Sequence, residues 1–201
     1  MYRSSEEYDR MAYLAIASIE DYGITAADYP LDMDTLCRRM RINSIPYSSY
    51  EGEDPGRIDL LMKKSKDGFF IPRSSKQEAT IFFNDKYGDH LSPARISQTK
   101  GHEIKHIVEE DVDDSEDDLC DYFSKYLRCP FPYVLYLKLE SIVDIIARFS
   151  ISYEQAEYVL SNVIKRRNRY GNGMFDYEIE LLKTLLGKEY EEKEIQLIAK
   201  E

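Results

Sequence analysis

Apolar residues recur at helical spacing along most of this chain, while residues 42 to 83 instead contain the short apolar runs that are typical of β-strands. Amphipathic helices are predicted at residues 5–22, 32–41, 139–149, 152–169 and 176–187. Strand-like runs lie at residues 42–47, 60–62, 69–71 and 79–83. The pattern predicts an α+β fold that is mainly helical, with a small antiparallel sheet.

Two further helices are predicted between this sheet and residue 130. Pro93 opens the first of them, because proline is favourable in the first turn of a helix. The second begins near Ser115 or Glu116, inside an acidic run that suits the positive end of a helix dipole. It stops before Pro130, and we expect the small sheet to pack beside the helix that starts at Pro93.

The length and charge of the chain restrict its class. With 201 residues it fits a core at 1–135 and a C-terminal helical region at 136–201 that packs on the core. A net charge of -11 disfavours binding to nucleic acid or to anionic membranes. Three cysteines, no evident signal peptide and no apolar run approaching ~20 residues lead us to expect a cytoplasmic protein.

The helix after Pro93 carries a candidate metal site. His102 and His106 are four residues apart, so their imidazoles stack on one face of a helix and can bind one Zn²⁺. Glu103 lies beside them and can take a proton from a zinc-activated water. The pattern predicts one zinc ion with Glu103 as the general base.

A catalytic zinc needs a third protein ligand, and the acidic run downstream offers several. Asp117 and Asp121 are one helical turn apart, so one could bind the metal while the other holds a histidine N–H. His90 lies upstream, in a predicted loop, and fits less well. The candidate carboxylates are Asp113, Asp114, Glu116, Asp117, Asp118 and Asp121.

Two segments together resemble the ImmA/IrrE family of metallopeptidases. Residues 101–107 (GHEIKHI) match its histidine–glutamate–x–x–histidine helix, and residues 117–130 (DDLCDYFSKYLRCP) resemble its second helix, which closes on a proline. Arg95 and Thr99 match an arginine and a threonine that usually stand just before the motif. The resemblance covers roughly residues 5–170, and two substitutions stand out: Lys105 replaces a common glycine and Cys120 a usual alanine.

The resemblance implies a zincin-like core in which His102 and His106 bind zinc and Glu103 is the base. It places the third ligand at Asp117, with Asp118 as the alternative, and leaves Asp121 as a partner that orients a ligand. Family members cleave regulatory proteins of the repressor type, often in mobile elements or stress responses. The expected partner is therefore a cytoplasmic transcriptional repressor that serves as the substrate.

Two other functions remain open. A non-catalytic zinc-binding regulatory module would use the same histidines without hydrolysis. Residues 139–169 also resemble a helix-turn-helix with a basic end at 165–169, although their apolar positions are what packing alone requires. Cys120 and Cys129 are interpreted as buried and inert, since neither has metal-ligand spacing with the histidines.

Overall fold

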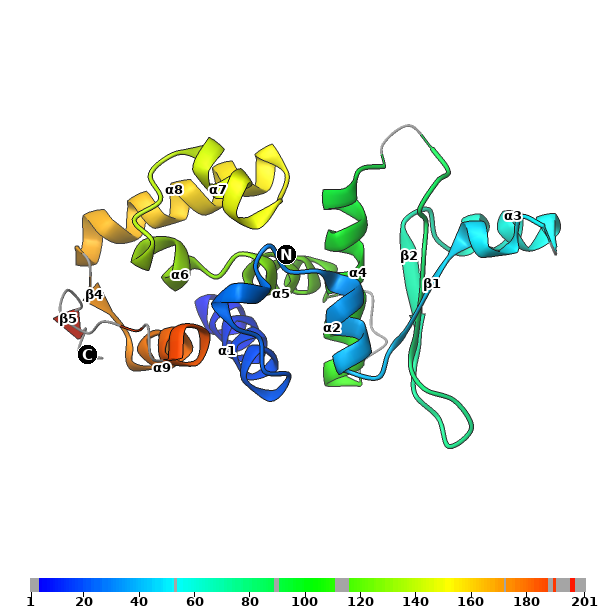
Figure 1. Ribbon diagram of the computed structural model, residues 1–201, viewed down its shortest axis with the longest axis horizontal. Helices are drawn as coiled ribbons and strands as arrows, with labels where there is room; N and C mark the ends of the chain where they lie inside the picture. Colours follow the sequence, from blue (N-terminus) through cyan, green and yellow to red (C-terminus); the bar gives the residue numbers. More distant parts are fainter. Residues whose placement is uncertain are drawn as a thin grey trace. The chain divides into compact units, whose positions relative to one another are not determined.

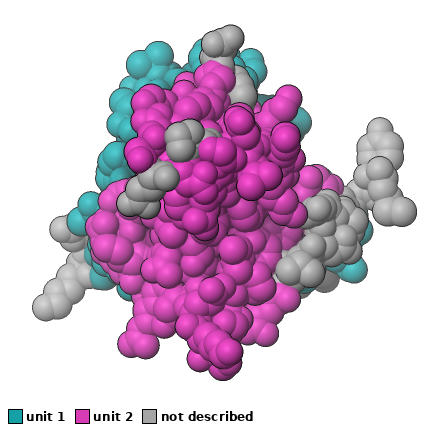
Figure 2. All heavy atoms as spheres, turned by 90° about the vertical axis from the view of Figure 1, so that its right-hand side faces the viewer, with its two compact units in different colours: residues 1–31, 125–201 teal, residues 32–124 magenta. Residues whose placement is uncertain are grey.

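The computed structural model describes residues 4–52, 54–88, 91–110, 116–171, 173–187, 190 and 196–197. The chain forms two compact units, which Figure 2 shows in different colours. Unit 1 contains residues 1–31 and 125–201, and unit 2 contains residues 32–124. Among its described residues, unit 1 is mainly helical with two short strands, and unit 2 combines helices with a small sheet, so the predicted α+β class is confirmed.

Unit 2 is built on a three-stranded sheet. Its strands are β1 (Asn43–Pro46), β2 (Gly68–Ile71) and β3 (Thr80–Phe83), in the order β1-β3-β2. Its helices are α2 (Met33–Arg39), the 3₁₀ turn η2 (Tyr47–Tyr50), α3 (Pro55–Lys64), α4 (Pro93–Glu109) and the first part of α5 (Asp117–Arg128). All four residues of the central strand β3 are buried, as expected of the middle of a sheet.

The sheet is mixed, which corrects the prediction of an antiparallel one. β2 and β3 are antiparallel, with Phe69 opposite Phe82, but β1 and β3 are parallel, with Ile45 opposite Phe82. More than thirty residues, including α3 and β2, separate β1 from β3. A connection of that length returns the chain to the end from which it started, and parallel strands require this.

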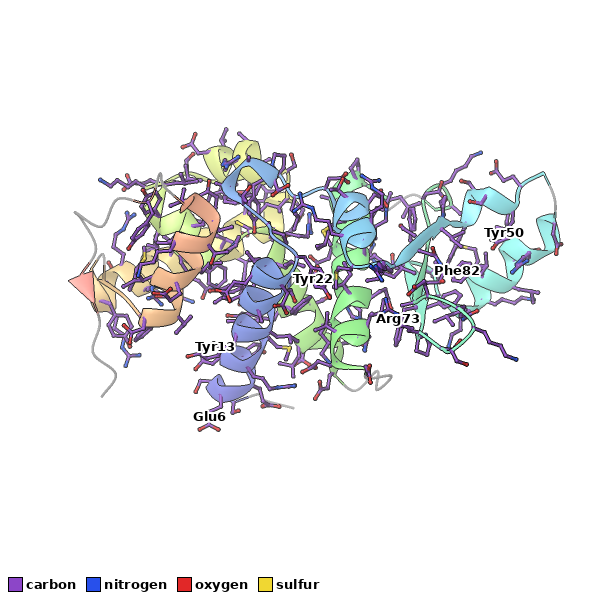
Figure 3. All side chains as sticks on the ribbon, turned by 60° about the horizontal axis from the view of Figure 1, so that its bottom comes forward. Glu6, Tyr13, Tyr22, Tyr50, Arg73 and Phe82 are labelled. Carbon is purple, nitrogen blue, oxygen red and sulfur yellow. The ribbon has the colours of Figure 1, made fainter. Side chains whose placement is uncertain are left out.

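Residues 60–62 lie in a helix, which corrects the prediction of a strand there. Helix α3 starts at Pro55 and runs to Lys64. Leu61 is buried with Tyr47 and Phe82, whereas Leu60 is 65% exposed. Tyr50 packs partly buried against the same cluster, and Figure 3 labels it together with Phe82. A three-residue apolar run is too short to reveal its period, so the sequence pattern was ambiguous here.

Helix α4 packs against both the sheet and α2 (Figure 1). Its start is as predicted: Ser92 caps the helix by accepting a hydrogen bond from the Arg95 N–H, and Pro93 occupies the first turn. The ammonium of Lys100 is 2.6 Å from Asp34 of α2 and 3.8 Å from the centre of the Phe83 ring. These contacts fix the helix against the sheet.

Unit 1 brings the first 31 residues together with the C-terminal helices. Its helices are α1 (Ser5–Asp21), η1 (Ala26–Asp28), the end of α5, α6 (Phe131–Tyr136), α7 (Ile142–Phe149), α8 (Tyr153–Tyr170) and α9 (Asp176–Leu186), and its short strands are β4 (Gly173–Met174) and β5 (Gln196–Leu197). Helix α6 was not predicted. The predicted division into a core at 1–135 and a C-terminal helical region at 136–201 stays a prediction.

Within the described ranges, none of the helices has both the length and the apolar character that crossing a bilayer demands.

Candidate metal centre

The two predicted histidines and Glu103 lie on the part of α4 that faces both β2 and α5. Gly101 allows the approach to α5, since a Cβ at this position would be 2.2 Å from Ser124 Oγ. The Ser124 hydroxyl donates to the Gln98 carbonyl of α4 at 2.9 Å. On the other side, a Cβ on Gly68 of β2 would be 2.7 Å from Thr99 Cγ2. Two glycines therefore hold α4 close to both neighbours.

His102 lies between two carboxylates of α5. Its Nδ1 is 3.1 Å from Asp121 Oδ1, and its Nε2 is 3.7 Å from Asp117 Oδ1. Asp121 also accepts a hydrogen bond from the Gln98 side chain at 3.3 Å. When the Nδ1–H donates to Asp121, the Nε2 lone pair points to the Asp117 side and is available to a metal.

His106 is buried, with 3% of its surface exposed. Its ring stacks on Phe70 of β2, with centroids 5.3 Å apart and planes 7° apart. Its Nε2 lies 3.4 Å from the Sγ of Cys120. The stacking fixes the ring plane, so the direction of the Nε2 lone pair is set by the packing of α4 on the sheet.

The donors gathered here suit a zinc ion. Ligand atoms of His102, His106 and Cys120 all lie within 4.8 Å of one another. Two donors of one tetrahedral zinc lie about 3.3–3.6 Å apart when the bonds have their usual lengths. The separations of 3.4 Å for Cys120–His106 and 3.7 Å for Asp117–His102 are close to that spacing. Imidazole, thiolate and carboxylate are the side chains that zinc binds in proteins.

Electrostatics at the site follow from burial and from the nearby acids. Burial lowers the pKa of His102, but the hydrogen bond that its ring donates to Asp121 and the charges of Glu103, Asp121 and Asp117 outweigh burial and raise that pKa above its usual value. Burial raises the pKa of the Cys120 thiol to about 12, against the opposing charge of Lys105. The site thus combines buried donors with a local excess of negative charge, which attracts a cation.

A cleft of about 600 Å³ in unit 2 is lined by both histidines, Glu103, Asp117 and Asp121, and Cys120 is not among its lining residues. Its walls come from β2, the residues before β2, α4 and α5: Lys64, Ser65, Asp67, Gly68, Phe69, Phe70, Arg95, Gln98, Thr99, His102, Glu103, His106, Asp117 and Asp121. Arg95 at its rim is paired with Asp67 through two hydrogen bonds of 2.8 and 2.7 Å. Glu103 lines the cleft although it is 7% exposed.

The structure brings most of the predicted site residues together. His102, Glu103, His106, Asp117 and Asp121 all line this cleft. Asp118 is exposed and does not line it. His90, Asp113 and Asp114 lie outside the described residues.

Sequence reasoning missed two residues of this region. Cys120 is buried, as predicted, yet it lies beside His106 instead of apart from the histidines. Its position three residues after Asp117, on the same helical face, was the available signal. Lys105 is fully buried, and its ammonium lies 2.8 Å from Glu116 and 3.0 Å from Glu109, so it ties the end of α4 to the start of α5.

No protein-family model matches this chain, and no curated protein or solved structure matches it significantly. The resemblance to the ImmA/IrrE metallopeptidases therefore rests on the motif residues alone and stays a prediction.

Proposed function

We propose that this protein is a zinc-dependent endopeptidase that cleaves one regulatory protein, with Glu103 as the general base. The observation that carries the proposal is the convergence of Glu103, the two histidines and Asp117 on one cleft, beside an edge strand of the sheet. A pair of histidines alone would support a metal site. A carboxylate beside them in an open cleft adds the means to move a proton.

Each side chain has a distinct role in the proposed reaction. His102, His106 and Asp117 would hold the zinc ion, and Asp121 would orient His102 by accepting a hydrogen bond from the His102 Nδ1–H. Zinc in such a site polarises the scissile carbonyl and lowers the pKa of water to about 7. Glu103 takes the proton from the attacking water and delivers it to the departing amine nitrogen.

The position of the cleft beside the edge strand β2 favours an extended peptide as substrate. β2 is an edge strand, and its residues Gly68, Phe69 and Phe70 line the cleft next to His106. An edge strand offers backbone N–H and C=O groups that pair with an added peptide strand. This pairing would hold a peptide along β2 with a carbonyl near the metal donors.

The substrate class comes from the family resemblance. A transcriptional repressor in the cytoplasm is the proposed substrate, and neither direct nucleic-acid binding nor membrane association is part of the proposal. The basic end of α8 fits this view, because Arg166 pairs with Glu178, and Arg167 lies 2.8 Å from Glu140. Guanidinium groups engaged in this way are less available to phosphates.

The decisive experiment compares the wild-type protein with Glu103→Gln. General base action is worth about 10²–10⁴ in rate, so the variant should lose cleavage almost completely while keeping its zinc. Assays should use candidate repressors encoded beside this gene, with Glu78→Gln as a matched control because Glu78 forms an exposed ion pair with Arg73. Equal cleavage by wild type and Glu103→Gln would refute the mechanism.

Metal content provides a separate check. We expect one zinc per chain in the wild type and loss of that zinc in His106→Ala, since the His106 ring has a fixed place among the donors. Equal zinc in both proteins would exclude this site.

A second candidate function is a zinc-binding regulatory module without hydrolytic activity. The position of Cys120 favours it, because a fourth protein donor near the histidines would close the site to water. Zinc binding without cleavage of any neighbour-encoded partner would support this function over the peptidase.

A further inference from the structure

We propose that Cys120 binds the metal directly through its sulfur, together with His102 and His106, so that this site has a thiolate donor beyond the Asp117 carboxylate. The inference rests on the metal site of the proposed function and specifies the donors of that site. Binding replaces the S–H bond by a sulfur–metal bond, and the proton leaves to solvent. No electron transfer is involved.

The distances support a sulfur donor at least as well as a carboxylate one. Cys120 Sγ lies 3.4 Å from His106 Nε2, close to the ~3.6 Å expected for a nitrogen and a sulfur on one tetrahedral zinc. Cys120 also belongs, with both histidines, to the group whose ligand atoms lie within 4.8 Å of one another. The thiol therefore already occupies a donor position.

Burial distinguishes the two donors of α5. Cys120 is 0% exposed, whereas the Asp117 side chain is 68% exposed. The contact of Gly101 with Ser124 and the ion pair of Lys105 with Glu116 fix the rotation of α5 about its axis. The thiol is thus held in place toward the histidines, while the carboxylate keeps rotational freedom at the surface.

This donor set has a functional consequence. Two imidazoles, a thiolate and a carboxylate would supply four donors to a zinc ion, which would leave no position for water. A peptidase would then need one donor to leave before it acts, and the exposed Asp117 is the donor with room to move. Cys120 would thereby hold the metal while the carboxylate opens the site.

Cobalt substitution of the full-length protein tests the inference without relying on activity. Cobalt(II) bound by a thiolate has an intense near-ultraviolet charge-transfer band, which imidazole and carboxylate ligands do not produce. We expect this band in the wild type and its complete loss in Cys120→Ser and Cys120→Ala. Cys129→Ser is the matched control, because Cys129 is equally buried but lies in unit 1, and it should keep the band.

The outcomes separate the two proposals. A wild-type protein that binds one cobalt in a His106-dependent manner without the band overturns the role of Cys120 and leaves the proposed metal site intact. The conclusion on Cys120 depends on the wild-type spectrum alone, so it holds even when a Cys120 variant does not fold. Cobalt that binds equally to wild type and His106→Ala overturns both proposals.

Discussion

At the scale of single residues, the side chains of the five-residue run from His102 to His106 have three different roles. The two histidines present the proposed metal donors, Glu103 lines the cleft, and Lys105 is buried in contact with two acids at the junction of α4 and α5. Of these roles, only that of Lys105, which positions α5 against α4, is absent from the predictions made on the sequence. The chemistry of the run thus depends on groups that α5 supplies.

The hydrogen bond between Asp121 and His102 should tune metal affinity. Removing the partner of a ligating histidine typically costs about 10–100-fold in affinity. We expect Asp121→Ala to bind zinc weaker by that factor, because His102 Nδ1 loses its acceptor. Competition with a chromophoric chelator measures the change.

Asp117→Ala and Asp118→Ala extend this comparison. Asp118 is exposed on the same helix and does not line the cleft, so its removal should leave zinc affinity unchanged, while removal of Asp117 should weaken it. A loss of affinity in Asp118→Ala with none in Asp117→Ala would transfer the ligand role to Asp118.

At the scale of elements, α4 is held between β2 and α5 by two close approaches. Gly68 lets Thr99 pack on β2, and Gly101 lets α5 come near through Ser124. Both approaches fix where the histidine face of α4 points, because Phe70 of β2 stacks on His106 and Asp121 of α5 meets His102. The site is therefore a product of helix packing as much as of the motif.

Gly101→Ala should destabilise the protein even though alanine favours helices. The added methyl group would lie 2.2 Å from Ser124 Oγ, and such overpacking costs typically about 1–3 kcal/mol. Gly56→Ala in α3 is the matched control, since its nearest neighbour is at 3.5 Å, and it should be neutral or stabilising by up to about 1 kcal/mol.

Urea unfolding of both variants measures the difference. The double variant Gly101→Ala with Ser124→Gly should recover part of the loss, because it removes the side chain that clashes. If the double variant recovers no stability, the strain in Gly101→Ala comes from a contact other than Ser124.

The start of α2 should show a pH-dependent contribution to stability. Asp32 caps this helix, and the hydrogen bond from Thr35 lowers the pKa of the Asp32 carboxyl. Its contribution is therefore present above the unfolded pKa near ~3.9 and is lost as pH falls through the lower folded value. We expect Asp32→Ala to cost about 0.5–2 kcal/mol at pH 7 and less below about pH 4.

Asp32→Asn serves as the control for this prediction. Asparagine retains the capping oxygen and does not titrate, so its stability relative to Asp32→Ala should not vary with pH. Thermal denaturation at several pH values between about 3 and 7 distinguishes the two variants. If the difference in stability between wild type and Asp32→Ala does not change with pH, the proposed role of the Asp32 charge is contradicted.

At the scale of the whole molecule, residues 1–31 and 125–201 belong to one compact unit, unit 1. The Arg148 guanidinium donates to the carbonyls of Ala26 at 2.8 Å and Tyr29 at 2.7 Å, and to the hydroxyl of Tyr133 at 2.7 Å. One side chain of α7 thus links the segment after α1 to α6. The N-terminal residues belong to the same unit as the C-terminal helices.

Arg148→Met should therefore lower the stability of the whole unit. Hydrogen bonds to charged groups contribute about 1.5–3 kcal/mol each, and the substitution leaves two carbonyls to find other partners. We expect the free energy of unfolding to fall by about 2–4 kcal/mol, which is measured as a lower denaturation midpoint. Arg169→Met, on the exposed end of α8, is the control and should change stability by less than about 0.5 kcal/mol.

The sequence by itself determined what depends on neighbours along the chain. The start of α4 at Pro93, the pairing of His102 with His106 and the end of α5 before Pro130 follow from caps, prolines and helical spacing, which act over a few residues. The mainly helical α+β class follows from the same local periods. These features are confirmed because local backbone preferences and the global fold agree.

Only the tertiary structure decided which distant residues meet. The parallel pairing of β1 with β3, the stacking of Phe70 on His106 and the approach of Cys120 to the same ring all depend on how helices and strands pack. Spacing along the chain placed Cys120 on the same face of α5 as Asp117, but it could not decide which face packs on α4 or the sheet, because two helices can pack through several faces and angles. The close approach of Gly101 to Ser124 belongs to one such packing, and this packing decides which side chains of α5 face the proposed metal site.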